Sequence, residues 1–111
     1  MAYDEVLAER VRELFAAEPD LTDKRMFGGL AFLLDGHMTV AVSGRGGLMA
    51  RLDRDAAERL AAEGPAEPME MRGRPMAGWL LVPPEALGSA RQLRTWVERS
   101  IAFVRTLPPK R

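Results

Sequence analysis

Hydrophobic residues recur at two different spacings along this chain, and the change of spacing divides it into elements. Over residues 4–18 they come every three or four positions, with Leu7, Val11 and Leu14 on one side and charged residues on the other. This spacing predicts an amphipathic helix. Pro19 follows directly, and the residue before a proline avoids the α conformation, so we expect the helix to end there.

From residue 24 the pattern changes to short apolar runs bounded by turn residues. We expect strands at residues 24–27, 30–34, 37–42 and 48–52. Asp35-Gly36 separates the second run from the third, and this pair favours a type I′ turn, whose two central residues both need positive φ. A glycine-rich turn at residues 43–47 leads into the fourth run. The segment therefore predicts a meander of antiparallel strands.

The second half of the chain predicts a short helix, two strands and a final helix. Asp53 is a favourable N-cap for a helix over residues 54–63. Strands are expected over residues 67–73 and 79–82, joined by a turn through residues 75–78. Pro83-Pro84 closes the second strand, because proline cannot donate to a sheet ladder. Ser89 and Gln92 have the spacing of a capping box, which predicts the start of the last helix.

The expected fold class is therefore α+β, with the element order α-β-β-β-β-α-β-β-α. A length of 111 residues is that of one domain, so we expect residues 1–111 to form a single domain. There is no cysteine, which excludes a disulfide framework and thiolate catalysis. No apolar run approaches the roughly 20 residues of a membrane span. We expect a soluble cytoplasmic protein.

Charge gives little support to a nucleic-acid-binding function. Sixteen basic residues balance sixteen acidic ones, so the formal net charge is zero. Dedicated nucleic-acid binders usually carry an excess of Lys and Arg that neutralises phosphates. A local basic patch remains compatible with this balance.

The clearest functional clue is that some strands are apolar on both sides. In residues 30–34 both alternating sets are apolar, and Ala41 and Met49 lie opposite the clearer core residues of their strands. If one sheet face packs on the helices, the other exposes apolar area, which is typical of interaction sites. That face is covered by a protein partner, by a second copy in a homodimer, or by the chain's own loops. Seven methionines suit an adaptable surface, although they fill core gaps equally well.

Basic residues near the strand ends form a second candidate site. The candidate interaction residues are Lys24, Arg25, Arg51, Arg72 and Arg74, together with Met49. If their strands are neighbours, several guanidinium groups could converge and bind phosphate through paired hydrogen bonds. Carboxylates are interleaved with them, at Asp23, Asp53, Asp55 and Glu70. A salt-bridged, solvated strand face is therefore the interpretation that we favour over a phosphate site.

Catalytic and metal-binding chemistry find no support in the sequence. His37 is the single histidine, and no second ligand or nucleophile stands at a suitable spacing. Gly28-Gly29 fits a bulge or tight bend better than a phosphate cradle, because it lacks the Gly-Lys-Ser/Thr ending of a P-loop. We expect no enzyme activity, no metal and no cofactor.

Several short motifs, in this order, resemble those of the TfoX N-terminal domain family. The motif residues are Met26, Phe27, Gly28, Gly29, Asp35, Gly36, Gly73, Pro75, Gly78 and Trp79. The last helix and the ending at residues 107–110 are also similar, so the resemblance covers residues 3–110. It implies a two-layer sandwich with helices on one face of an antiparallel sheet, similar to secretion-chaperone-like folds. It also implies a link to competence regulation, in which founding members act with a cyclic-AMP-receptor-type activator.

Together these features favour a non-enzymatic regulatory or interaction module that works through protein–protein contact, as a homodimer. The partner would be a transcription factor or the chain itself. One alternative is direct nucleic-acid binding through an arginine-rich strand face. Another is a small-ligand site near Trp79, His37 and the Gly28-Gly29 bend.

Overall fold

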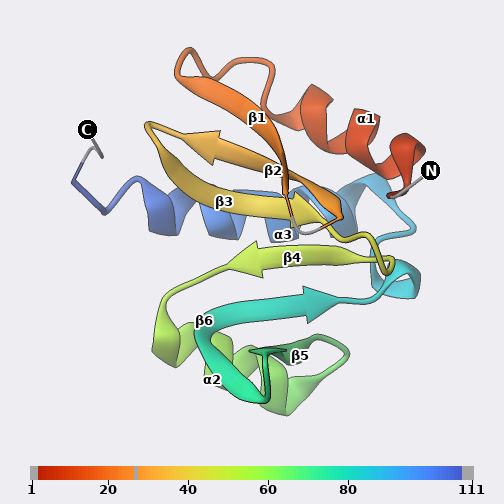
Figure 1. The fold of residues 1–111 in the computed structure, drawn as a ribbon, viewed down its shortest axis with the longest axis vertical. Helices are drawn as coiled ribbons and strands as arrows, with labels where there is room; N and C mark the ends of the chain where they lie inside the picture. The colour runs from red at the N-terminus through yellow and green to blue at the C-terminus, as the bar shows by residue number, and fades with distance from the viewer. Residues whose placement is uncertain (1–2, 27, 109–111) are drawn as a thin grey trace.

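A computed structural model describes residues 3–26 and 28–108 and has the expected order of elements (Figure 1). In chain order they are α1 (Glu5–Leu14), β1 (Leu21–Met26), β2 (Gly29–Leu34), β3 (His37–Val42), β4 (Leu48–Arg51), α2 (Arg54–Glu63), β5 (Glu67–Met71), β6 (Arg74–Val82), the 3-10 turn η1 (Pro84–Ala86) and α3 (Ala90–Val104). Phe27, which we expected at the end of the first strand, lies outside the described residues.

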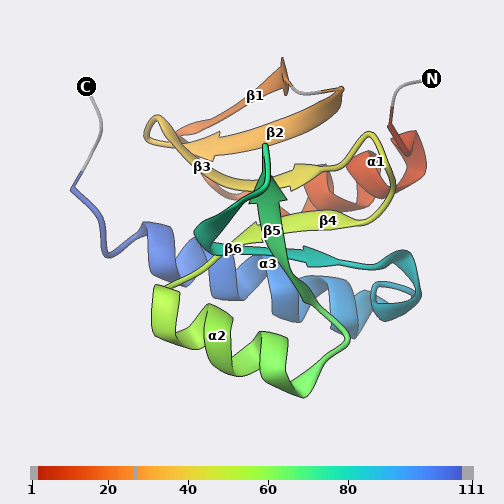
Figure 2. The ribbon, with the colours of Figure 1, turned by 60° about the horizontal axis from the view of Figure 1, so that its bottom comes forward.

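The six strands form one antiparallel sheet in the order β1-β2-β3-β4-β6-β5. Strand β6 therefore lies between β4 and β5, and β1 and β5 are the two edges. All three helices pack on one side of this sheet, with α3 running behind β3 and β4 (Figures 1 and 2). The structure confirms the α+β sandwich.

Side-chain caps begin all three helices, at Asp53 and Ser89 as the sequence predicts and also at Asp4, for which no cap was predicted. Asp4 accepts hydrogen bonds from the backbone of Val6 and Leu7, and Asp53 caps α2 in the same way. At α3 the capping box is complete, because the Ser89 hydroxyl accepts from the Gln92 N–H while the Gln92 side chain accepts from the Ser89 N–H. These bonds satisfy backbone donors that have no partner within the helix.

Helix α1 ends at Leu14, earlier than the expected boundary at Pro19. The N–H of Phe15 bonds to the carbonyl of Arg12, and the chain then makes a further turn to Glu18. The fully buried Phe15 ring stacks on Phe32 of β2, with centroids 5.5 Å apart. The helix thus ends at the point where the Phe15 ring is buried against the sheet.

Two hairpins have turns in which both central residues are left-handed. Asp35 and Gly36 have φ values of 53° and 84°, which confirms the predicted type I′ turn. Between β5 and β6 the same pattern falls on Arg72 and Gly73, with φ of 55° and 78°.

The expected turn through residues 75–78 is therefore wrong, and so is the extension of the fifth strand to Gly73. Residues 75–78 belong to β6, and Arg74 begins that strand instead of lying on the polar face of β5. The Arg72-Gly73 pair was missed because arginine is an unusual residue at a left-handed position. Pro75 also suggested that strand pairing stops at this position, but β6 continues through it.

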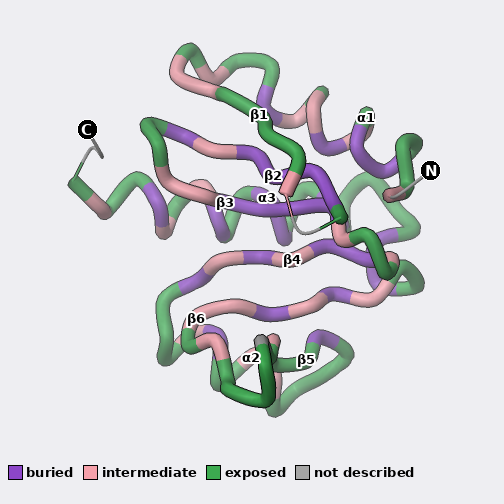
Figure 3. Tube along the Cα trace, in the orientation of Figure 1, coloured by how far each residue is buried: buried purple, intermediate pink, exposed green. Residues whose placement is uncertain are grey.

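The core lies between the sheet and the helices. Along β4 the inward residues Leu48 and Ala50 are fully buried, whereas Met49 and Arg51 on the other side remain partly exposed (Figure 3). Inward side chains of the other central strands meet the apolar sides of α1 and α3, including Val11, Leu93 and Val97. One face of the sheet therefore makes the core, and none of the described helices lies over the opposite face.

The Gly28-Gly29 pair has a structural role in this packing. Gly28 takes a left-handed φ of 77°, and a Cβ at Gly29 would lie 2.2 Å from the carbonyl oxygen of Val42 on β3. No residue other than glycine fits so close an approach without moving the backbone. The pair thus joins β1 to β2 as the tight bend that its sequence predicts.

Candidate functional site

One cross-strand row shows what the helix-free face presents. The register pairs the residues of the row in the order Lys24, Ala31, Ala41, Met49, Leu81 and Glu67. Directly paired residues of antiparallel strands point to the same face. The four central residues are apolar, and charges stand only at the two ends. Ala31 and Ala41 are 0% and 5% exposed, while Met49 and Leu81 remain partly exposed.

This face is concave. Lys24 of β1 and Trp79 of β6 line the same depression, although β2, β3 and β4 lie between these two strands in the sheet. In Figure 2 the β5–β6 hairpin stands up on the side opposite α3, and β1 curls over from the other end of the sheet. The right-handed twist and coiling of the strands give this curvature. Gly78 in β6 has a left-handed backbone conformation, which allows the strand to bend locally.

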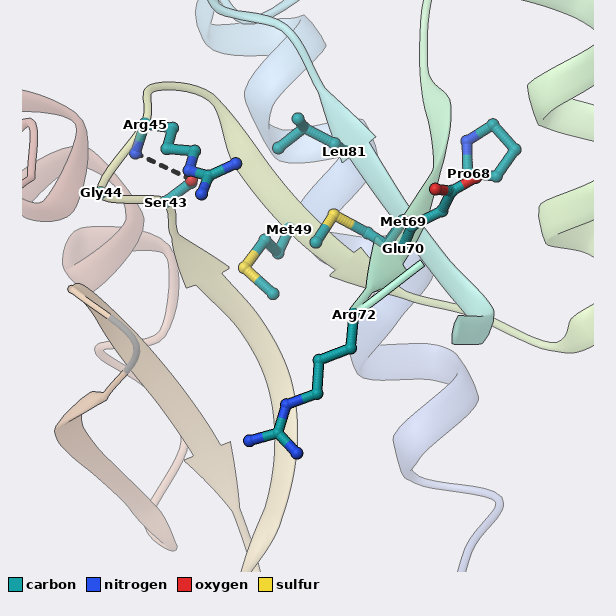
Figure 4. A pocket seen from close by; sticks show the side chains of 9 residues that line it. All are labelled: Ser43, Gly44, Arg45, Met49, Pro68, Met69, Glu70, Arg72 and Leu81. Carbon is teal, nitrogen blue, oxygen red and sulfur yellow. Dashed lines mark hydrogen bonds between the residues drawn. The ribbon is translucent and has the colours of Figure 1, made fainter. Parts of the chain in front are cut away.

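The first depression lies under the β5–β6 hairpin and has a volume of about 410 Å³. Its lining residues are Ser43, Gly44, Arg45, Met49, Pro68, Met69, Glu70, Arg72 and Leu81. Figure 4 shows the thioethers of Met49 and Met69 next to one another at its centre. Arg72 extends from the hairpin tip, and Arg45 stands in the β3–β4 loop.

The second depression, of about 770 Å³, continues along the same face toward the start of β3. Its lining residues are Lys24, Met26, Leu33, Gly36, His37, Met38, Arg51, Trp79 and Pro108. It is broad and open to solvent. Met49 and Leu81 of the first depression lie two residues from Arg51 and Trp79 of the second on the same strands, so the two depressions are neighbours on this face. We call them together the concave groove.

Two polar side chains of the second depression are already engaged. The His37 Nε2 donates to the carbonyl oxygen of Pro108 at 2.6 Å. Arg51 donates to the carbonyl of Met38 at 3.3 Å, and its Cζ lies 5.8 Å from the ring centroid of Phe103, within range of a cation–π contact. Both residues therefore fasten the end of α3 and the segment after it to β3.

The other predicted interaction residues separate into two groups. Lys24, Arg72 and Met49 line the groove together with Arg51. Arg25 pairs with the inward-facing Leu30, so it lies on the side of β1 opposite Lys24. Arg74 begins β6 and lines neither depression. The structure thus brings four of the six predicted residues to one surface.

Two of the four carboxylates expected to neutralise these cations are engaged elsewhere. Asp23 forms an ion pair with Arg12 of α1 at 3.3 Å, on the helix side, and this hydrogen bond raises the pKa of Arg12. Asp53 caps α2. Within residues 3–26 and 28–108, no ion pair within 4.0 Å involves Lys24, Arg45 or Arg72. The groove lining contains four cationic residues and one carboxylate, Glu70.

Sequence reasoning missed several groove residues, namely Met38, Arg45, Met69 and Leu81. Two further lining residues had been noted without being assigned to a site: Met26 as a motif residue and Leu33 within the apolar run of residues 30–34. The alternation along β6 could have found Leu81, because Leu80 and Val82 are the buried set. Met69 could not be found in this way, since it sits at an irregularity in the β5–β6 pairing between Pro68 and Glu70.

A charged cluster outside the groove secures α3. Arg105, just after the helix, pairs with Glu18 and Asp20 in the segment before β1. The hydrogen bond from Arg105 lowers the pKa of Asp20, and the two carboxylates raise the pKa of Arg105. These residues stabilise the fold and are not part of the groove.

In the part of the chain that the structure describes, no group of three or more His, Cys, Asp or Glu side chains is arranged to hold a metal ion. No described helix is both long and apolar enough to cross a membrane.

The family model of the TfoX N-terminal domain matches residues 13–104 of this chain. The match includes all six strands, α2 and α3, and hence every strand that lines the groove. The search of curated proteins found no significant match.

Proposed function

This chain belongs to the TfoX N-terminal domain family, and we propose that it is a non-enzymatic interaction module that binds a protein partner through the concave groove. One observation carries the proposal: the helices cover only one sheet face, and the other keeps partly exposed methionine and leucine side chains in a hollow. Contiguous apolar surface of this kind marks protein interaction sites. The β5–β6 hairpin covers part of the face, and the groove is the part that remains.

The setting that we propose for this binding is regulatory. The family link to competence regulation supports contact with a transcription factor. Concave surfaces on a rigid sheet suit such a role, because the floor is already formed and little ordering is needed on binding.

The chemistry of the groove supports a role without catalysis. General acid–base catalysis needs a titratable group within reach of the reacting atoms. His37 and Arg51 line the groove, but each is held by a backbone carbonyl. The titratable side chains of Lys24 and Glu70 come from the two opposite edge strands. The centre between them is Met49, Met69 and Leu81, which supply contact area and no proton transfer.

The arrangement gives less support to direct nucleic-acid binding. Arg25 and Arg74 lie outside the groove, so the arginines do not form one continuous strand face. Thioether and leucine side chains make most of the floor, and Trp79 is the single aromatic residue among the described lining residues, whereas base stacking favours several rings.

Self-association is a separate part of the proposal. A homodimer would bury apolar area in the same way as a foreign partner. Sedimentation velocity at tens of micromolar distinguishes the cases: a dimer is expected, and a strict monomer would contradict this part while leaving binding to another protein intact.

Affinity capture from the native host, with two matched variants, tests the interaction proposal. Met49→Glu places a charge in the groove, whereas Val6→Glu makes the same kind of change at an exposed apolar residue of α1. A specific partner should be retained by the wild type and by Val6→Glu and lost by Met49→Glu. Equal capture by all three proteins would contradict the proposal.

A further inference from the structure

The floor of the groove is a face of the sheet, built on its central strands, and residues of the two edge strands β1 and β5 line its sides. Strands β2, β3, β4 and β6 are paired on both sides, so their backbone donors and acceptors are used within the sheet. An extended segment binds best at an edge, where it can continue the ladder. A helix satisfies its own backbone groups and presents only side chains, so it is the form of chain that a sheet face can accept.

The dimensions of the groove suit one helix. It follows β3, whose six residues span about 20 Å at the rise of a strand. A helix of about 13 residues has this length, and its diameter is about 10–12 Å with side chains. Four neighbouring strands make a floor about 14 Å wide at the usual spacing.

Methionine dominates the apolar lining. Four of the seven methionines, Met26, Met38, Met49 and Met69, line the groove. Their thioethers are flexible and polarisable, and they adapt to side chains of different shapes. Grooves lined in this way accept the apolar side of an amphipathic helix.

The lining of the groove carries more positive than negative charge. Lys24, Arg45, Arg51 and Arg72 stand against one carboxylate, although the whole chain has a formal net charge of zero. Three of these cations have no ion-pair partner among the described residues, as noted above. A helix of complementary charge would carry acidic residues on both sides of its apolar stripe, where they would face the rims of the groove.

Arg72 adds an independent observation. It occupies the first left-handed position of the β5–β6 turn, with a φ of 55°, where Asn, Asp or Gly is usual. Left-handed backbone costs an arginine free energy, and such strain often accompanies a functional role. Its side chain lines the groove, so this residue combines an unfavourable backbone with a position on the binding surface.

We infer that the groove binds an amphipathic helix of a partner protein, whose apolar stripe contacts the methionines and whose acidic flanking residues pair with Lys24, Arg45 and Arg72. This inference rests on the proposed interaction function and specifies the chemistry of the partner. It makes Arg72 a specificity-determining residue.

Methionine-methyl NMR on the full chain tests the inference. The probes are three synthetic helical peptides of about 14 residues that share one apolar stripe and carry Glu, Gln or Lys at the flanking positions. The Glu peptide should shift the methyl signals of Met38, Met49 and Met69. Met76 is an internal control, because it lines a different depression, beside α2. Its signal should stay in place.

Affinity and one variant complete the test. The Glu peptide should bind about tenfold more tightly than the Lys peptide at low salt. Arg72→Asn should weaken the Glu peptide about fivefold and leave the Gln peptide unchanged, since asparagine suits the turn and removes only the charge. Arg74→Asn is the matched control and should have no effect on either peptide.

Different failures have different meanings. Equal or tighter binding of the Lys peptide at the groove methionines overturns the acidic partner but leaves the groove as a protein-binding surface. If none of the three peptides shifts these methyl signals, the helical partner is wrong, and the capture experiment with Met49→Glu still tests the proposed function separately. If a DNA duplex shifts the same signals and the peptides do not, a helical protein partner is also wrong.

Discussion

Met49 of β4 pairs directly with Leu81 of β6, and both side chains lie on the sheet face that no helix covers. Their neighbours in sequence, Leu48 and Leu80, point the other way and are buried in the core. The two strands thus present apolar side chains to both sides. A binding surface on a stable sheet requires this arrangement, because residues on the floor of the groove can be substituted without altering the residues of the core.

The two sides of β4 should respond differently to truncation. Leu48→Ala removes a fully buried side chain and should lower the free energy of unfolding by about 2–5 kcal/mol. Met49→Ala should cost less than about 1 kcal/mol, since Met49 already contacts solvent. Chemical denaturation of the two variants measures the difference. Equal losses would mean that the open face is packed like the core.

The two glycines at the β1–β2 bend should not be equivalent. A methyl group at Gly29 would meet the Val42 carbonyl at 2.2 Å, whereas a Cβ at Gly28 has no atom within 4 Å. Gly28→Ala should cost about 1–2 kcal/mol through its left-handed backbone. Gly29→Ala should cost more or prevent folding. Thermal unfolding checks the order, and a more stable Gly29→Ala would contradict the close approach to β3.

Arg72→Asn should raise stability. The substitution keeps the left-handed turn and replaces a poorly suited residue with a favoured one, so a gain of about 0.5–1 kcal/mol is expected. Asp35, at the corresponding position of the β2–β3 turn, is already a suitable residue, and Asp35→Asn should change little. Thermal melts measure both. A destabilised Arg72→Asn would show that the arginine contributes to the fold itself.

The Asp20–Arg105 pair should stabilise the fold at neutral pH and not in acid. Because Arg105 lowers the pKa of Asp20, the unfolded chain binds more protons there than the folded one as the pH falls. The contribution is present above the unfolded pKa of about 3.9 and is lost as the pH falls through the lower folded pKa.

Arg105→Gln should therefore reduce the melting temperature at pH 7 and have a much smaller effect at about pH 2.5. Arg94→Gln, a change at an exposed residue of α3, is the control and should leave the melting temperature unchanged at both pH values. An undiminished effect of Arg105→Gln in acid would contradict the role of Asp20.

Ser100→Ala should stabilise α3. The Ser100 hydroxyl is fully buried and has no hydrogen-bond partner among the described residues. Removing it relieves the desolvation of an unsatisfied group and improves helix propensity, for a gain of about 1 kcal/mol. Ser89→Ala, which breaks the capping box, should instead cost about 1 kcal/mol. A loss of stability in Ser100→Ala would point to a hydrogen bond that the structure does not show.

Much of the fold was predictable because local chemistry determines it. Asp53 and Ser89 cap helices by local hydrogen bonds, and Asp35-Gly36 specifies its turn without distant contacts. The β5–β6 turn was not predictable in this way, because Arg72 does not favour the backbone that it adopts. The position of β6 between β4 and β5 is likewise a tertiary choice with no local signal.

The candidate site was predictable only as a tendency. The two-sided apolar pattern of residues 30–34 and the position of Met49 indicated a second apolar face, and the register places Ala31 and Met49 on it, with Ala31 buried and Met49 partly exposed. Which charges border that face depends on strand order and turn geometry. Arg25 therefore lies away from the groove, while Arg45, in a loop with no alternating pattern, lines it.

Photo-crosslinking in the native host tests the central claim most directly. A photoreactive amino acid in place of Met49 lies at the centre of the groove, and the same amino acid in place of Val6 lies on exposed α1. We predict a specific protein adduct from position 49 and none from position 6. Adducts from position 6 alone, or none from position 49, would contradict the claim that the helix-free face is the functional surface.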